Sequence, residues 1–155
     1  MATTDLRPSP IAGTWYEGNP DRLTREVDGY LDAAKVLALD GEVVAVIAPH
    51  AGHRYSGAVA GYAFASVRGR SFDLVAVVSP FHRPAYQPLL TTAHSAYATP
   101  LGNVATDKES LLALEEALKS KLGFGLAPIL RDQEHSLEIE LPFLQRALTG
   151  DFRLL

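Results

Sequence analysis

The chain has 155 residues, of which 47% are hydrophobic and 21% charged, a composition typical of one globular domain. The formal net charge of −4 is spread along the chain, so no cluster of lysine and arginine offers a footprint for nucleic acid. Cysteine is absent, which excludes disulfides and thiolate metal ligands. No apolar run approaches the roughly 20 residues of a membrane-spanning helix, and residues 1–10 lack the apolar part of a secretory signal, so we expect a cytoplasmic protein without a membrane partner.

A first helix is predicted after an irregular arm that carries Trp15 and Tyr16. Asn19-Pro20-Asp21 is typical of a helix start, with an N-cap, a proline in the first turn and an acid near the positive end of the helix dipole. Apolar residues recur at helical spacing up to residue 34, and Asp40-Gly41 is expected to end the helix. The continuous apolar run of residues 43–48 then predicts a strand buried on both faces.

A helix over about residues 57–68 and a second buried strand over residues 72–79 follow. This strand–helix–strand unit predicts a parallel pair of strands with a right-handed crossover. Because ligands of open parallel sheets bind outside the carboxyl ends of the strands, the polar loops that follow the two strands are the first candidates for chemistry. We therefore expect His50 and His82, one in each loop, to lie in the same site.

The second half of the chain is expected to continue the alternation of strands and helices. Short strands are predicted over residues 87–93, 127–130 and 151–155. Thr106 and Glu109 match a capping box, with Thr106 as the N-cap of a helix that has a buried leucine stripe and ends at Gly123. A later helix is expected to kink or restart at Pro142. Because the pattern stops within its last strand, we expect residues 1–155 to form an incomplete domain, or a sheet that another chain completes.

Histidines dominate the polar loops. His50, His53 and His82 could form a mononuclear metal site, because neutral imidazole is a common ligand of zinc, copper and iron. Two histidines and one carboxylate would suit non-haem iron(II). The alternative is that these histidines cap loops and bond to the backbone. His135 beside Glu134 could act as a general acid or base, or add a ligand, whereas the simpler role of this dipeptide is to cap a helix start.

Other polar residues of the loops carry weaker signals. Tyr55 and Ser56 are candidates for the lining of the same pocket, but no G-x-S-x-G elbow surrounds Ser56, which disfavours a serine nucleophile. Neither a dinucleotide-binding pattern nor a phosphate loop is present. His94 lies in a polar turn and is expected at the surface.

Several motifs, taken in order, resemble the Memo family. They are Ala12-Gly13-Thr14-Trp15-Tyr16, Pro49-His50-Ala51-Gly52, Tyr55-Ser56-Gly57, Ser79-Pro80-Phe81-His82, Thr99-Pro100-Leu101-Gly102, Glu134-His135-Ser136-Leu137-Glu138 and Leu141-Pro142-Phe143-Leu144. The resemblance covers nearly the whole chain. It implies a three-layer α/β/α sandwich with a mostly parallel central sheet, similar to the catalytic subunit of class III extradiol dioxygenases, and a pocket associated with iron or copper.

By the same resemblance, His50 and His82 fall on the metal-site histidines of the family and His135 on its Glu-His-Ser element. Prokaryotic members are grouped with an AMMECR-type protein and a radical-SAM protein as protein B of the AmmeMemoRadiSam system. Family members usually carry an aromatic residue where this chain has His53, and they are longer, with further pocket residues in a C-terminal half.

Three functions are therefore weighed. The leading hypothesis is a metal-dependent, dioxygenase-like redox enzyme that acts on an unknown small molecule. The second is a binding or scaffold module that uses the same cleft for a peptide, a partner subunit or a second copy of the chain. The third is a metal-dependent hydrolase in which Glu134 or His135 serves as the base.

Overall fold

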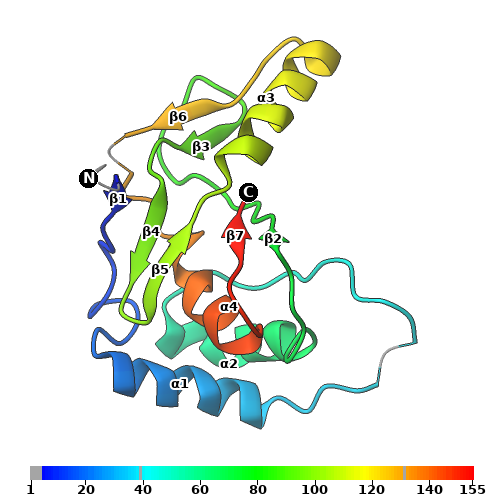
Figure 1. Cartoon of the computed structure of the whole chain (residues 1–155). Helices are drawn as coiled ribbons and strands as arrows, with labels where there is room; N and C mark the ends of the chain where they lie inside the picture. The colour runs from blue at the N-terminus through cyan, green and yellow to red at the C-terminus, as the bar shows by residue number, and fades with distance from the viewer. Residues whose placement is uncertain (1–4, 39, 131) are drawn as a thin grey trace.

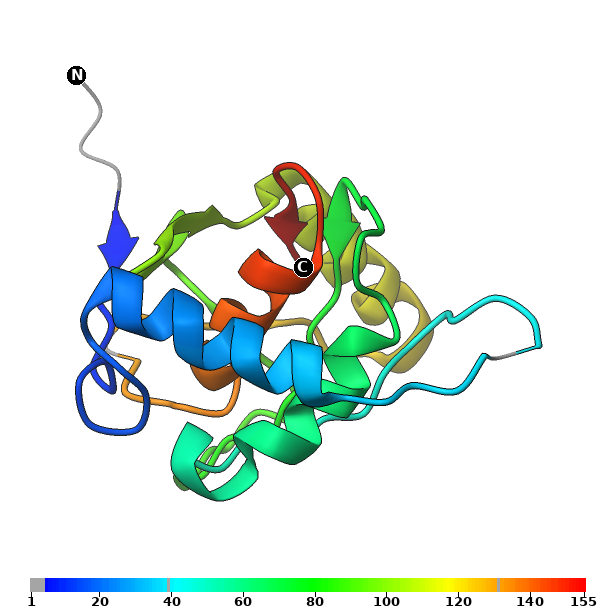
Figure 2. The same ribbon diagram turned by 90° about the horizontal axis from the view of Figure 1, so that it is seen from below.

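The computed structural model describes residues 5–38, 40–130 and 132–155. Helices α1 (Pro20–Ala33), α2 (His53–Ala65) and α4 (Leu141–Ala147) pack against one another, whereas α3 (Lys108–Leu122) lies beyond the strands at the opposite end of the view in Figure 1. Figure 2 looks from the side of α1 and shows the strands behind it. The predicted α/β class is confirmed. In the described part of the chain, no helix is both long and apolar enough to cross a membrane.

The strands are short and form small sheets. β1 (Leu6–Arg7), β4 (Ala96–Thr99) and β5 (Gly102–Ala105) lie side by side in the order β1-β4-β5. The other pairs are β2 (Leu74–Val75) with β7 (Arg153–Leu154) and β3 (Leu90–Thr92) with β6 (Ala127–Ile129), and both are parallel. β3, β6 and β7 confirm the three predicted strands of the second half in shorter form. The motif Thr99-Pro100-Leu101-Gly102 forms the turn of the antiparallel β4–β5 hairpin.

Helix α1 begins where the sequence predicts. The Asn19 side chain accepts a hydrogen bond from the Arg22 backbone nitrogen at 3.1 Å, and Leu23, Val27 and Leu31 are buried on one face. The helix ends at Ala33, not at Asp40-Gly41, because the apolar residues that follow no longer fall on the buried face. Leu37, for example, is 83% exposed.

Helix α2 lies very close to α1 because it presents small residues there. A Cβ atom at Gly61 would lie 2.6 Å from the Tyr30 carbonyl oxygen, and one at Gly57 would lie 2.5 Å from the Tyr30 ring. Phe64 of α2 stacks on Phe143 of α4 with ring centroids 5.2 Å apart. The helix spans residues 53–65, not 57–68, and the His53 backbone nitrogen donates to the Trp15 carbonyl at 2.9 Å at its start.

The two apolar runs predicted as paired, buried strands fold differently. Residues 43–48 form no strand and make no backbone hydrogen bond with any described residue, and Val44 and Ile47 are 91% and 97% exposed. Residues 72–79 contribute only β2, which pairs with β7 and leaves Val78 97% exposed. Both runs instead line one cavity of about 1090 Å³. An apolar run favours a strand, but burial requires neighbours on both edges and faces, which a local pattern cannot specify.

The helix after the hairpin is capped one residue later than predicted. Asp107, not Thr106, is the N-cap of α3, and its carboxylate accepts a hydrogen bond from the Ser110 backbone nitrogen at 2.9 Å. Gly123 ends the helix in the left-handed conformation with φ of 78°, as predicted. The leucine stripe is not buried: Leu122 is 59% exposed, and no residue of α3 is buried in the described structure. Periodicity identifies the apolar face of a helix but not what covers it.

The last helix confirms the restart at Pro142. A single 3₁₀ turn, η1 (Glu138–Glu140), leads directly into α4, and Pro142 occupies the first turn of that helix. Proline is tolerated there because the first backbone nitrogens of a helix have no carbonyl partner within it. The turn buries Glu138 and Glu140, and Phe143 follows at 1% exposure.

Candidate metal centre

Histidines from three separate loops converge at one place. His50 follows residues 43–48, His82 follows β2, and His135 precedes η1. One ring nitrogen of each lies within 4.8 Å of the corresponding atoms of the other two. The ring centroids are 5.2 Å apart for His50 and His82, 4.6 Å for His82 and His135, and 5.9 Å for His50 and His135. Since imidazole nitrogens bind transition metals at about 2 Å, only small side-chain movements separate this arrangement from three ligands on one ion.

The expected meeting of His50 and His82 therefore occurs, although the strands before them do not pair as predicted. Each loop is fixed by other contacts. Ser136 is fully buried, and its hydroxyl donates to the Pro80 carbonyl at 2.6 Å, which ties the loop of His82 to the loop of His135. In the sequence, only the Glu-His-Ser motif of the family resemblance points to Ser136.

Glu134 organises two of the three histidines. One oxygen of its carboxylate, Oε2, accepts from the His82 backbone nitrogen at 2.6 Å. The other, Oε1, lies 2.9 Å from His82 Nδ1 and 3.1 Å from His135 Nδ1. Oε1 also accepts from the backbone nitrogens of His135 and Ser136 at 2.8 Å and 3.0 Å. Burial alone raises the pKa of Glu134, but the hydrogen bonds from His82, Ser136 and His135 outweigh it and lower that pKa to about 2.

An ionised carboxylate can only accept hydrogen bonds, so His82 carries a proton on Nδ1 and donates a hydrogen bond from it to Glu134. This leaves Nε2 of His82 free as a ligand, the arrangement in which a carboxylate fixes the tautomer of a metal-binding histidine. A carboxyl group with a pKa near 2 is a poor general base at neutral pH, which favours an orienting role for Glu134 over proton transfer. Burial is the largest cause that lowers the pKa of His135. His82 and His50 lower it further, whereas Glu134 raises it. The net lowering favours the neutral form of the ring, which is the form that binds a metal.

His53 does not join the other histidines. It is 2% exposed, its Nε2 lies 3.1 Å from the Ile139 carbonyl, and its ring packs against Phe143 and Tyr16 with centroids 4.9 Å and 5.4 Å away. Burial lowers its pKa, so the ring is neutral and donates Nε2–H to Ile139. The structure thus brings His135, and not His53, together with His50 and His82. For His53 the alternative expectation, a histidine bonded to the backbone, describes its position.

The other residues considered from the sequence have different surroundings. Tyr55 is 84% exposed on α2, and the Ser56 hydroxyl donates to the Ala51 carbonyl at 3.0 Å. His94 is buried, contrary to the expectation of a surface position, and its Nδ1 pairs with Asp5 Oδ1 at 2.9 Å. Polarity of the neighbouring sequence did not reveal this distant partner.

Comparison with known proteins agrees with the motifs. The sequence model of "Memo-like protein" matches residues 7–155. The "Protein memo-1 homolog" of Caenorhabditis elegans is 35% identical over 144 residues, an alignment that covers 92% of this chain and 39% of that protein. "MEMO1 family protein MHO1" of Saccharomyces cerevisiae is 31% identical over 149 residues, covering 92% and 44% respectively. A "MEMO1 family protein" of Nitrosopumilus maritimus is 28% identical over 154 residues, covering 97% and 55%. The chain thus spans between two fifths and a little over half of these relatives.

Proposed function

Because the chain belongs to the Memo family, we propose that His50, His82 and His135 hold one iron or copper ion and that the protein uses it in a redox reaction of a small molecule. The convergence of the three ring nitrogens within 4.8 Å is the observation that supports this proposal. Neutral imidazoles suit both metals, and three protein ligands leave coordination positions open. A bound ion of this kind would supply electron-transfer and oxygen chemistry.

The residues around the histidines have roles of their own in this proposal. Glu134 holds His82 in the tautomer that presents Nε2, and it contacts the His135 ring at Nδ1. The His82 side chain is 45% exposed, so a small molecule can reach the site from solvent. The Trp15 ring lies beside His135 with centroids 4.2 Å apart and is 41% exposed, so it provides an apolar wall on one side.

Metal content of untagged protein tests the proposal. We expect about one equivalent of iron or copper in the wild type after incubation with iron(II) or copper(II) and removal of excess metal, and a large loss in His50→Ala, His82→Ala and His135→Ala. His94→Ala is the matched control, because it removes a buried histidine outside the centre. Equal metal contents in all five proteins would contradict the proposed site.

A specific observation favours binding of a second chain as the other candidate function. β7 pairs with β2 through backbone groups of Asp73, Val75 and Val77, so the backbone groups of the residues between them point away from β7. Residues 43–48 line the same cavity and have no backbone hydrogen bonds to described residues. Two unpaired apolar edges that line one cavity suit the insertion of an extended strand from a second copy of the chain.

Light scattering coupled to size exclusion tests this second candidate. The wild type should form a dimer whose population rises with concentration, and Ile47→Asp should shift it to monomer by placing a charge on the 97% exposed apolar edge. Leu112→Asp, at a 63% exposed apolar residue of α3, controls for the same change of charge. A wild type that stays strictly monomeric across the concentration range would contradict strand insertion by a second copy.

A further inference from the structure

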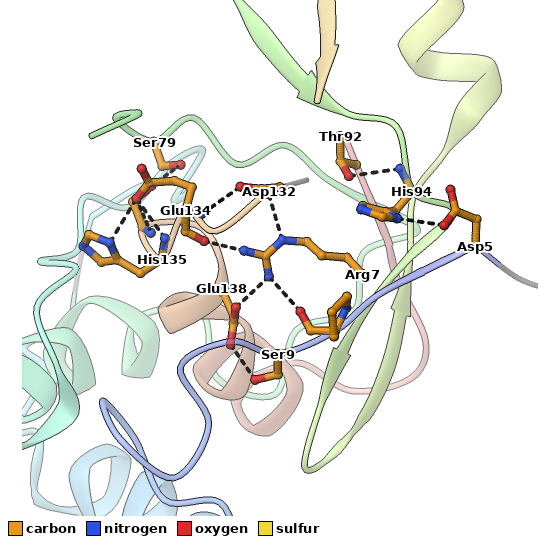
Figure 3. A network of polar contacts seen from close by, with 12 residues as sticks. Asp5, Arg7, Ser9, Ser79, Thr92, His94, Asp132, Glu134, His135 and Glu138 are labelled. Atoms are coloured by element: carbon orange, nitrogen blue, oxygen red, sulfur yellow. Dashed lines mark hydrogen bonds and ion pairs between the residues drawn. The ribbon is translucent and has the colours of Figure 1, made fainter. Parts of the chain in front are cut away.

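A single buried arginine of the N-terminal arm (residues 5–18) holds the segment that carries Glu134 and His135. Arg7 is 0% exposed, and its Nε donates to Asp132 Oδ2 at 2.7 Å. Its Nη1 donates to Glu138 Oε2 at 2.6 Å, and its Nη2 donates to the Glu134 carbonyl oxygen (Figure 3). A fully buried guanidinium is tolerated only with such partners, and here three of them belong to one short segment.

Arg7 restrains both the carbonyl group and the backbone nitrogen of Glu134. It binds the carbonyl directly, and it fixes Asp132, whose Oδ1 accepts from the Glu134 backbone nitrogen at 2.7 Å. With both peptide groups fixed, the Glu134 side chain leaves the segment in one direction, towards His135 (Figure 3). The same carboxylate lies 2.9 Å from His82 Nδ1. The contacts therefore form a continuous path from Arg7 to the two imidazoles.

The arm is also anchored to the sheet, through the pairing of β1 with β4. Arg7 lies in β1 opposite Tyr97 of β4, and the Tyr97 ring lies 4.9 Å from the guanidinium carbon. Farther along the arm, Ser9 Oγ and Tyr16 Oη donate to Glu138 Oε1 at 2.5 Å and 3.0 Å. The arm thus fixes the segment at its start, through Arg7 and Asp132, and at its end, through Glu138.

We propose that Arg7 is a positioning residue of the histidine centre, which acts through Asp132 and Glu134 to set the tautomer of His82 and the orientation of His82 and His135. This inference rests on the proposed metal function, but part of its test needs no metal. The competing explanation is that Arg7 only stabilises the fold, so the experiment has to separate loss of stability from loss of orientation.

The tautomer of His82 in metal-free protein is the first readout. Long-range ¹H–¹⁵N correlation spectra should show protonation at Nδ1 in the wild type and a mixture of the two tautomers in Arg7→Met. Val27→Ala is the matched control, because it weakens the buried face of α1 and removes none of the polar contacts of Arg7. We expect it to unfold at lower urea concentration while the His82 tautomer stays unchanged. A tautomer unchanged in Arg7→Met, or altered equally in Val27→Ala, would overturn the inference whatever the metal result.

Titration with Co²⁺, whose visible absorption reports ligand geometry, is the second readout. Arg7→Met should raise the Kd for Co²⁺ about 10- to 100-fold and change the spectrum, the range typical for loss of contacts that orient ligands. Arg7→Lys, which keeps the charge but not the planar fork, should fall between Arg7→Met and the wild type. Arg146→Met breaks an exposed pair with Asp28 remote from the centre and should change the Kd less than twofold.

The outcomes separate the two proposals. A wild type that binds no Co²⁺, iron or copper would overturn the metal site itself. A wild type that binds while Arg7→Met shows the same affinity and spectrum would overturn the positioning role alone. If Arg7→Met does not fold by circular dichroism, Asp132→Asn decides instead. It keeps the Arg7–Glu138 pair but removes a charged acceptor between Arg7 and Glu134, and unchanged Co²⁺ affinity in that variant would contradict the inference.

Discussion

Glu140 is a buried acid whose removal should stabilise the protein at neutral pH. Its side chain is 8% exposed, and Oε2 has no hydrogen-bond partner among the described residues. Burial raises its pKa to about 8. In the folded protein the carboxyl group is therefore mostly protonated at pH 7, whereas in the unfolded chain it is ionised.

The size of the effect follows from linkage. A carboxyl with a raised folded-state pKa favours folding most below the unfolded value of 4.5, and this contribution is lost as the pH rises from about 4.5 to about 8. At about 1.4 kcal/mol for each pH unit, the loss at pH 7 is about 3 kcal/mol. Glu140→Gln should recover most of this lost stability. About 1 kcal/mol is subtracted because Gln places its amide donors in the cavity that Glu140 lines.

Urea unfolding at pH 4 and pH 7 measures the difference. We expect Glu140→Gln to be about 2 kcal/mol more stable than the wild type at pH 7 and equal or slightly less stable at pH 4. Glu116→Gln on the exposed face of α3 is the matched control and should show no such dependence on pH. The same stability difference at both pH values, or a less stable variant at pH 7, would refute the reasoning from burial.

Further predictions concern packing and are checked by urea unfolding of each variant. Gly61→Ala should lower the free energy of unfolding by about 1–3 kcal/mol, because its Cβ would meet the Tyr30 carbonyl at 2.6 Å. Gly29→Ala, with nothing within 4 Å, should instead stabilise α1 by about 0.5–1 kcal/mol, and equal effects of the two changes would contradict the close approach. Phe143→Ala should cost about 3–5 kcal/mol, and a cost below 1 kcal/mol would contradict its place in the core. Ile47→Ser should stay within about 0.5 kcal/mol of the wild type at low protein concentration, where a large loss would mean that this side chain is covered.

Features with a local cause could be predicted from the sequence. The start of α1 depends on Asn19 and Pro20, the end of α3 on the left-handed Gly123, and the restart before α4 on Pro142. Each involves neighbours a few residues apart, so the residue types carry the necessary information. The same holds for the positions of His50 and His82 in loops that follow apolar runs.

Features with a distant cause could not be predicted in this way. Residues 43–48 have strand composition but no strand partner in the described structure, and the buried His94 pairs with Asp5, 89 residues away. Arg7 contacts Glu138 across 131 residues, and nothing near it in the sequence indicates that contact. Local patterns specify conformation and polarity, whereas burial and pairing are properties of the assembled chain.

The three histidines are unequally restrained, which has a consequence for how an ion would be captured. Glu134 fixes two of the rings, but His50 follows the unpaired residues 43–48. An incoming ion would meet His82 and His135 already held in place, but its binding would have to order His50 and residues 43–48. The conformational entropy that this segment would lose opposes binding of the ion. Any event that aligned residues 43–48 as a strand would remove this opposition, and by reciprocity the captured ion would favour the same alignment. The docking of a strand and the affinity for the ion would then both depend on one equilibrium, the ordering of residues 43–48.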